Sequence, residues 1–219
     1  MVKPQGLTPS TRDQTPRDHI LDAAAEVFAE LGFHGARVDE IARRAGVNKA
    51  MLYYRIGDKA ALYAGVLSRS FRLAQAAVEA GLVDATSPVE RISALISAMV
   101  NTILDMPEMP RIMLREIAAG GDSLPPDSMA EMSALLDLVR SVLQEGADAG
   151  VFRTVQPVLA HLTLLGGIAF MTATRPLRER MAEQGADTAA PSAAEDLSAF
   201  LSDLVLHGII AVPGQGATP

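Results

Sequence analysis

The chain has 219 residues, 49% of them hydrophobic and 4% aromatic, with no cysteine and no tryptophan. This hydrophobic content is enough for a core, and the absence of cysteine excludes a disulfide framework and any thiolate metal site. The net charge of −7 is unevenly spread: residues 1–72 contain 11 basic and 8 acidic residues, and the remainder contains 8 and 18. A basic amino-terminal part on an acidic body is typical of a protein that approaches a polyanion in one orientation.

The amino-terminal segment, residues 1–16, is polar and has no apolar h-region, so we expect a flexible arm and not a signal peptide. Residues 17–31 then carry hydrophobic side chains at helical spacing, which predicts the first helix. We expect Gly32 to end this helix, because glycine readily adopts a positive φ.

Residues 38–62 predict two short helices joined by a tight turn. Val38, Ile41 and Ala45 fall on one face of the first of them, and Gly46 is expected to stop it. Asn48 is a natural N-cap for the second, residues 50–56, whose Leu52 is expected to face inward with Ile56. Two short helices around a glycine turn, with basic residues outside, are typical of a helix-turn-helix.

Two motifs give this region a specific resemblance. The pattern IxxAAxxxFxxxGF spans residues 20–33, and IAxxAGVxxxxLYxxxxxKxxL begins at Ile41. Together they resemble the amino-terminal domain of the TetR (tetracycline-repressor) family, over about a quarter of the chain. The family usually has an aromatic residue or histidine at Arg55, phenylalanine at Ile56, glutamate at Ala60 and a hydroxyl residue at 36 or 37.

The resemblance implies an all-α protein with an N-terminal three-helix DNA-binding domain at residues 17–63. A helical regulatory and dimerisation domain would follow at 64–212, with a tail at 213–219. The implied DNA-binding residues are Arg43, Arg44, Asn48, Lys49, Ala50, Met51, Tyr53, Tyr54, Arg55 and Lys59. By this resemblance Tyr53 and Lys59 contact phosphates, and Lys49 and Tyr54 read bases or backbone. Arg44 fits a solvated helix face equally well.

The body is predicted to be a series of helices. Asp58 is expected to cap a long helix, residues 59–80, which links the head to the body. A capping box from Ser87 to Glu90 predicts the next helix. A shorter helix over 111–119 follows two prolines and ends at a glycine pair. Another begins near residue 124 and has Gly146 near its end.

The last two predicted helices are unusually apolar. Residues 154–174 carry no charge and are long enough to span a membrane, but Gln156, Pro157 and His161 dilute their hydrophobicity. We therefore expect no membrane span and interpret 157–175 as a helix covered on two sides. A capping box from Ser192 to Glu195 predicts the final helix, 192–211. In the TetR family such helices form a homodimer interface, and the alternative is that both are simply core.

An enzymatic function is not supported by the residues present. Four histidines have no metal-ligand spacing, and the sequence has no GxSxG motif, phosphate-binding glycine loop or cysteine nucleophile. We therefore expect no catalytic residues, no metal and no cofactor. His161 is interpreted as a core or ligand-contacting residue.

Methionines concentrate in the predicted body, where they favour an adaptable apolar pocket, although a plain core explains them as well. The candidate ligand-binding residues are Phe71, Met99, Ile103, Met106, Met109, Met113, Met132 and Phe170, with Met129 in the same group. We predict a cytoplasmic homodimeric regulator that a small, apolar or amphipathic ligand releases from a palindromic double-stranded DNA operator. The alternatives are an activator of the same fold, or a helical protein that has lost DNA binding.

Overall fold

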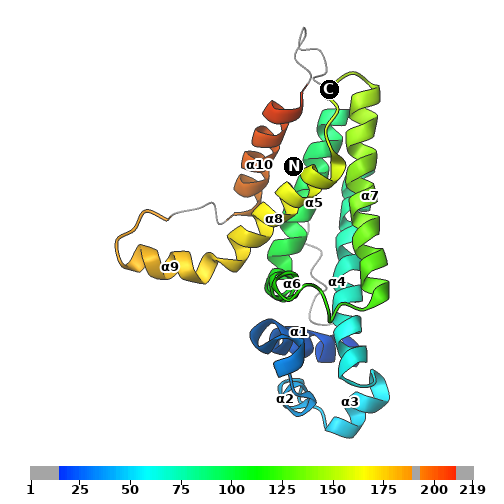
Figure 1. Ribbon diagram of the computed structural model, residues 1–219, viewed down its shortest axis with the longest axis vertical. Helices are drawn as coiled ribbons and strands as arrows, with labels where there is room; N and C mark the ends of the chain where they lie inside the picture. Colours follow the sequence, from blue (N-terminus) through cyan, green and yellow to red (C-terminus); the bar gives the residue numbers. More distant parts are fainter. Residues whose placement is uncertain (1–14, 189–192, 211–219) are drawn as a thin grey trace. The chain divides into compact units, whose positions relative to one another are not determined.

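The computed structural model describes residues 15–188 and 193–210, which form ten helices (Figure 1). They are α1 (Pro16–Gly35), α2 (Val38–Arg44), α3 (Lys49–Arg55), α4 (Lys59–Leu82), α5 (Pro88–Asp105), α6 (Glu108–Ala118), α7 (Pro126–Asp148), α8 (Pro157–Ala173), α9 (Arg175–Glu183) and α10 (Ala194–Ile209). These ranges contain no strand. Phe152 and Ile210 form an isolated antiparallel bridge. The all-α prediction is confirmed. The predicted tail, most of the arm, and the Ser192 of the last capping box lie outside the described residues.

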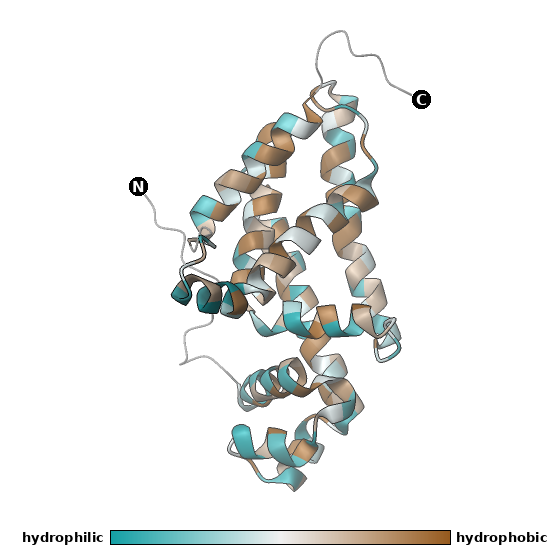
Figure 2. Ribbon diagram, turned by 60° about the vertical axis from the view of Figure 1, so that its left-hand side comes forward, coloured by the Kyte–Doolittle hydropathy of each residue, from teal (hydrophilic) through white to brown (hydrophobic). Residues whose placement is uncertain are grey.

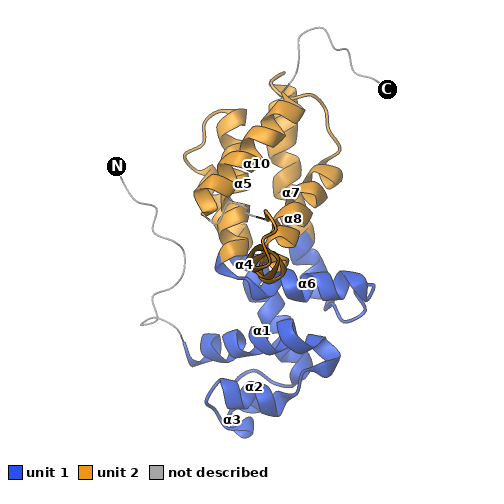
Figure 3. Cartoon of the chain, turned by 90° about the vertical axis from the view of Figure 1, so that its left-hand side faces the viewer, with its two compact units in different colours: residues 1–73, 105–132 blue, residues 74–104, 133–219 orange. Residues whose placement is uncertain are grey.

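The chain divides into two compact units (Figure 3). Unit 1 comprises residues 1–73 and 105–132, and unit 2 comprises residues 74–104 and 133–219. Unit 1 therefore contains α1 to α3, α6 and the first parts of α4 and α7. The predicted domain 17–63 falls within unit 1, and its boundary at residue 63 remains a prediction.

Unit 1 is built around an aromatic cluster under the helix-turn-helix. The Phe28 ring lies 4.8 Å from that of Tyr63 in an edge-on contact, and Phe33 lies 5.0 Å from Tyr63. Ile20, Ile41 and other aliphatic side chains of α1 and α2 are fully buried in the same unit. Aromatic pairs at such distances add to the free energy gained from burial, so the three rings fix α1 on α4.

Local signals in the sequence account for most helix ends. Thr15 begins α1 through a capping box with Asp18, and at Gly32, where φ is +69°, the helix is interrupted as predicted. Asp58 caps α4 by accepting the Ala61 N–H at 2.9 Å. In the Ser87–Glu90 box, Ser87 Oγ accepts the Glu90 N–H and Glu90 accepts the Ser87 N–H. The predictions for Gly32, Asp58 and the Ser87–Glu90 box are thus confirmed.

Unit 2 has its own hydrophobic core, to which α4, α5, α7, α8 and α10 all contribute. Its buried members include Val78, Ile92, Leu95, Ile96, Met99, Val100, Val139, Val142, Leu143, Phe152, Leu164, Ile168, Leu197, Leu201 and Ile209. The helices of both units carry hydrophobic and hydrophilic residues along their length (Figure 2).

Gly146 lies near the end of α7, as predicted, but it does not stop the helix. The helix runs on to Asp148, and the residue with positive φ is Gly150, at +68°. Gly146 is instead buried beneath the ring of Phe152, which lies only 1.9 Å from where a β-carbon would be. The glycine is required there by close packing and not by backbone conformation.

The region after α8 also differs from the prediction. The helix ends at Ala173, and a separate helix that the sequence did not predict, α9, begins at Arg175. In the described ranges, no single helix is both long and apolar enough to span a membrane; α8 and α9 meet that test only as a pair bent by 49°.

Candidate nucleic-acid interface and ligand cavity

The turn between α2 and α3 is made by the residues that the sequence indicated. Gly46 has a φ of +64°, a conformation that other residues rarely adopt. Asn48 then caps α3, because its Oδ1 accepts the Met51 N–H at 2.7 Å. Leu52 is fully buried and anchors α3 in unit 1. The helix-turn-helix geometry therefore rests on one glycine, one cap and one anchor.

With Leu52 inside, α3 presents its other side chains outward. Tyr54 is 90% exposed, Tyr53 45% and Met51 40%. Ala50 and Arg55 are exposed as well. A helix of this size with exposed polar and aromatic side chains is suited to the major groove of B-DNA.

Two of the predicted DNA-binding cations are paired with carboxylates of α2. Lys49 Nζ lies 2.8 Å from Asp39 Oδ1, and this contact raises the pKa of Lys49. Arg43 donates to Glu40 through Nε at 2.9 Å and Nη2 at 2.7 Å. These hydrogen bonds, with those from Arg44, lower the pKa of Glu40 from 4.5 to about 2.

Arg44 lies in a network that joins α2 to α1. It donates to Glu40 at 2.8 Å and to both carboxylate oxygens of Glu30, at 2.6 and 2.9 Å. Glu26 is a third carboxylate, 3.6 Å away, and the side chain of Arg44 is 23% exposed. A guanidinium with this many carboxylate partners is occupied in holding the two helices together.

Lys59 is also engaged by the protein. Its Nζ donates to the carbonyl oxygens of His34 at 3.3 Å and Ala36 at 3.2 Å, and it lies 4.8 Å from the centre of the Phe33 ring. These carbonyls follow the kink at Gly32, so Lys59 ties the start of α4 to the end of α1. An ammonium group has three donors, which leaves one for a further acceptor.

The start of α2 follows the departure from the family pattern that the sequence showed. Its N-cap is Arg37, which makes no side-chain capping hydrogen bond, where a hydroxyl residue would provide one. Asp39 and Glu40 occupy the first turn, where negative charge favours the helix N-terminus.

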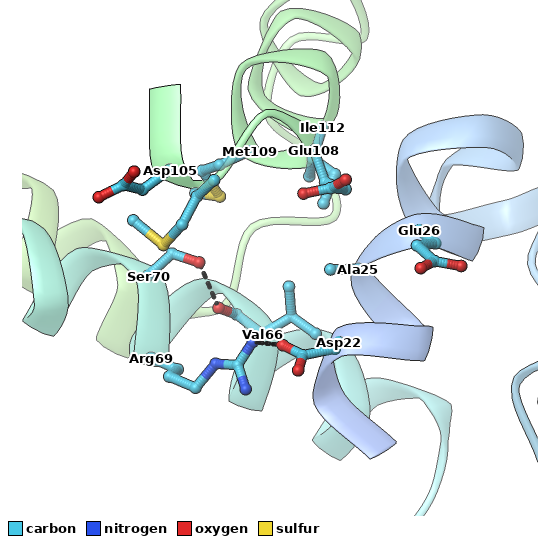
Figure 4. A pocket seen from close by; sticks show the side chains of 11 residues that line it. Asp22, Ala25, Glu26, Val66, Arg69, Ser70, Asp105, Glu108, Met109 and Ile112 are labelled. Carbon is cyan, nitrogen blue, oxygen red and sulfur yellow. Dashed lines mark hydrogen bonds and ion pairs between the residues drawn. The ribbon is translucent and has the colours of Figure 1, made fainter. Parts of the chain in front are cut away.

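A cavity of about 220 Å³ lies within unit 1, between α1, α4 and the α5–α6 segment (Figure 4). Its lining residues are Asp22, Ala25, Glu26, Val66, Arg69, Ser70, Asp105, Met106, Glu108, Met109 and Ile112. Arg69 is bonded to Asp22, and the Ser70 hydroxyl donates to the Val66 carbonyl at 3.0 Å. The lining thus combines apolar side chains with four carboxylates and one guanidinium.

Of the predicted ligand-binding residues, Met106 and Met109 line this cavity. Phe71, Met113, Met129 and Met132 belong to the same unit but do not line it, and Met99 and Ile103 belong to unit 2. Phe170 is 63% exposed on α8. The acidic lining was missed because its residues come from two segments far apart in the sequence, α1 and the α5–α6 segment, with no common spacing.

The wall of the cavity formed by α6 is bonded to the helices that carry the helix-turn-helix. Arg115 donates to the carbonyls of Ala29 at 3.2 Å and Glu30 at 2.9 Å on α1. Tyr63 on α4 donates to the buried Glu116 at 2.7 Å. These bonds join α6 to α1 and α4 within unit 1.

His161 lies on the core side of α8 in unit 2. It is 9% exposed, burial lowers its pKa, and its Nδ1 has no hydrogen-bond partner among the residues described. Within the same ranges, no group of three or more histidine, cysteine or acidic residues could hold a metal ion.

The fold and this geometry define a helix-turn-helix protein with a separate helical body. A family model described as the tetracyclin repressor-like C-terminal domain matches residues 88–205, and one described as bacterial regulatory proteins, tetR family, matches residues 20–66. The first of these covers more than half of the chain. The protein therefore belongs to the tetR family of bacterial regulatory proteins.

Individual relatives agree with this assignment. The chain is 30% identical over 138 residues to the HTH-type transcriptional regulator RutR of Escherichia coli K12, covering 63% of this chain and 65% of RutR, just under two thirds of that relative. It is 28% identical over 210 residues to the HTH-type transcriptional repressor NicS of Pseudomonas putida, covering 93% and 96%. The crystal structure of the TetR family regulator PfmR from Thermus thermophilus matches with a TM-score of 0.68 and 25% identity, over 86% of this chain and 97% of PfmR.

Proposed function

We propose that this protein is a one-component transcriptional regulator that represses its target genes by binding double-stranded operator DNA. The observation that carries this proposal is α3: a helix capped by Asn48 and anchored by Leu52, with Lys49, Tyr53 and Tyr54 directed outward. Family membership supports the same function. An activator with the same interface is the alternative, which a reporter gene distinguishes by the sign of its response.

DNA binding is tested by selecting bound sequences from a library of random duplexes. We expect an inverted repeat whose half-sites lie about one helical turn, roughly 34–36 Å, apart. Lys49→Ala and Tyr54→Ala should weaken binding to the selected duplex, and both residues are exposed, so the fold should be retained. Arg180→Ala is the matched control, because it also removes one exposed positive charge but lies on α9 in unit 2. If no sequence is enriched, or if Lys49→Ala and Arg180→Ala behave alike, the proposal fails.

We further propose that the protein acts as a homodimer through α8 and α10, the segments predicted as 157–175 and 192–211. Each helix has one side in the unit 2 core and large apolar side chains outside it. On α8, Leu159 and Leu162 are 61% and 58% exposed; on α10, Phe200 and Leu204 are 57% and 59% exposed. Exposed apolar surface of this kind is typical of a protein interface. Gly166 and Gly167 on α8 have no neighbour within 4 Å of a β-carbon, which leaves room for a second helix.

We place the effector in the unit 1 cavity. At about 220 Å³ the cavity is smaller than the roughly 300–1,000 Å³ typical of drug-sized ligands, so the effector should be a small molecule. Val66, Met109 and Ile112 offer apolar contact, while Asp105 and Glu108 have no cationic partner in the described part of the chain. These features favour a short aliphatic amine over the purely apolar ligand that the methionines alone suggested.

The ligand site is tested by fluorescence polarisation of labelled operator DNA in the presence of hexylamine, hexanoate or hexanol. We expect hexylamine to release the DNA at lower concentration than the other two. Met109→Trp should fill the cavity and abolish this response, whereas Met129→Trp, at a 53% exposed position outside the lining, should retain it. An equal response of both variants would mean that the effector binds elsewhere.

A further inference from the structure

Two cations of the proposed DNA interface, Lys49 and Arg43, already have acidic partners. Asp39 on α2 holds Lys49 of α3 at 2.8 Å, and Glu40 holds Arg43 through two hydrogen bonds. A carboxylate offers a cation the same kind of charged oxygen acceptor as a DNA phosphate does. Phosphates must therefore compete with Asp39 and Glu40 for these two cations.

The two carboxylates differ in how firmly they are held. Glu40 is 30% exposed and accepts from both Arg43 and Arg44, and Arg44 continues to Glu30 on α1. Glu40 is thus part of the network that joins the helices. Asp39 is 71% exposed, and its partner Lys49 is 51% exposed. Exposed ion pairs of this kind contribute little to stability, so the Asp39–Lys49 pair can open at small cost.

The positions of Asp39 and Lys49 connect this pair to recognition. Lys49 is the first residue of α3, and Asp39 is the second residue of α2, ten residues earlier in the chain. The turn at Gly46 brings them together beside the exposed face of α3. A change at Asp39 therefore acts at the start of the recognition helix.

We propose that Asp39 is a specificity-determining residue, which competes with DNA phosphates for Lys49 and so suppresses binding to non-cognate sequences. The inference rests on the proposed DNA-binding function. Non-specific binding depends almost entirely on phosphate contacts, whereas specific binding adds contacts to base edges. The pair with Asp39 lowers the attraction of Lys49 for a phosphate, whereas the contacts of specific binding to base edges remain. Asp39 thus weakens non-specific binding more than specific binding.

A purely structural role for Asp39 makes a different prediction. Its carboxylate lies in the first turn of α2, where it interacts favourably with the helix N-terminus in the absence of a side-chain cap from Arg37. If this were its whole contribution, replacing it would lower the melting temperature and leave the ratio of specific to non-specific affinity unchanged. The experiment must therefore measure both.

The experiment compares wild type with Asp39→Asn, which removes the charge, and Asp39→Glu, which keeps it. Asp84→Asn is the matched control: it removes an exposed carboxylate between α4 and α5 in unit 2. Fluorescence polarisation gives the dissociation constants for the selected operator and for a scrambled duplex of the same length and composition, at several salt concentrations. Circular dichroism and thermal melting verify the fold of each variant.

We expect Asp39→Asn to raise the affinity for the scrambled duplex by about 2- to 30-fold, the effect of freeing one exposed cation in each of two protomers. The slope of log K against log salt should steepen by about 0.9 for each freed lysine. The gain for the operator should be smaller, so discrimination falls. Asp39→Glu and Asp84→Asn should remain close to wild type.

A second set of variants shows whether Asp39 acts through Lys49. In a Lys49→Ala background, Asp39→Asn should no longer raise the affinity for the scrambled duplex, because the cation for which it competes is absent. An equal gain in both backgrounds would indicate simple repulsion between Asp39 and DNA and would overturn the inference. So would an unchanged affinity ratio with a lowered melting temperature. If wild type does not distinguish operator from scrambled DNA, the proposed function fails first, and this inference fails with it.

Discussion

The packing of Phe152 on Gly146 gives a quantitative prediction about the body. In Gly146→Ala the new β-carbon would lie 1.9, 2.3 and 2.7 Å from three atoms of the Phe152 ring. Ordinary contacts of a β-carbon begin near 3.4 Å, so the ring would have to retreat by about 1.5 Å. Phe152 is 3% exposed and belongs to the unit 2 core, where it has little room to move.

Two opposing effects set the expected free energy of unfolding. Alanine in a helix interior is favoured over glycine by about 1 kcal/mol. Overpacking a core costs about 1–3 kcal/mol, and a 1.5 Å displacement of a buried ring belongs at the upper end of that range. We therefore expect Gly146→Ala to lower the free energy of unfolding by about 2 kcal/mol.

Urea unfolding, followed by circular dichroism at fixed protein concentration, measures this change. In a Phe152→Leu background, which reduces the clash, Gly146→Ala should become neutral or stabilising by up to about 1 kcal/mol. Gly81→Ala is the control, since its β-carbon would lie at an ordinary 3.5 Å from the nearest atom, the Ala94 carbonyl oxygen. If Gly146→Ala stabilises the wild-type protein as Gly81→Ala does, the packing argument is refuted.

Three further predictions concern the DNA contact, the dimer and the response to acid. Lys59→Ala should weaken binding to operator and non-specific DNA alike, and it should flatten the slope of log K against log salt by about one unit per half-site. An unchanged slope would mean that Lys59 contacts no phosphate and serves only to bond the His34 and Ala36 carbonyls. Leu162→Glu combined with Leu204→Glu should give monomers in sedimentation experiments, whereas Leu177→Glu, at a 50% exposed position on α9, should not. Glu90 has its pKa lowered from 4.5 to about 2 by hydrogen bonds from the N–H groups and hydroxyls of Thr86 and Ser87. The contribution of the Glu90 carboxylate to stability is therefore complete above pH 4.5 and is lost as the pH falls through 2. Glu90→Gln should therefore reduce the loss of stability between pH 4.5 and 2 in urea titrations, and an unaltered pH profile would argue against the capping box.

The helix-turn-helix could be predicted from the sequence because its determinants are local. Gly46, Asn48 and Asp58 each act within one helical turn of their own position, and the structure has each in the predicted conformation or hydrogen bond. The Ser87–Glu90 box is equally local. Signals of this range are preserved in the sequence whatever the rest of the chain does.

The features that were missed depend on contacts that reach beyond one helical turn. Gly146 lies near the end of α7 as predicted, but the sequence did not indicate that the ring of Phe152 packs against it. The cavity takes its carboxylates from α1 and from the α5–α6 segment, more than 70 residues apart. Composition pointed to methionines there, and two of them do line the cavity, but composition could not indicate which charges would surround them.

The charge of residues 1–72 also depends on contacts that the sequence does not show. Residues 1–72 have three more basic than acidic residues, which suggested a positive surface for DNA. In the structure, however, Arg43, Lys49 and Arg44 are all paired with carboxylates, and Lys59 is bonded to backbone carbonyls. A count of charges therefore overstates the number of cations that are free to meet phosphates. Because the carboxylates compete with DNA phosphates for these cations, the partners of the cations, Asp39 above all, should also influence DNA affinity.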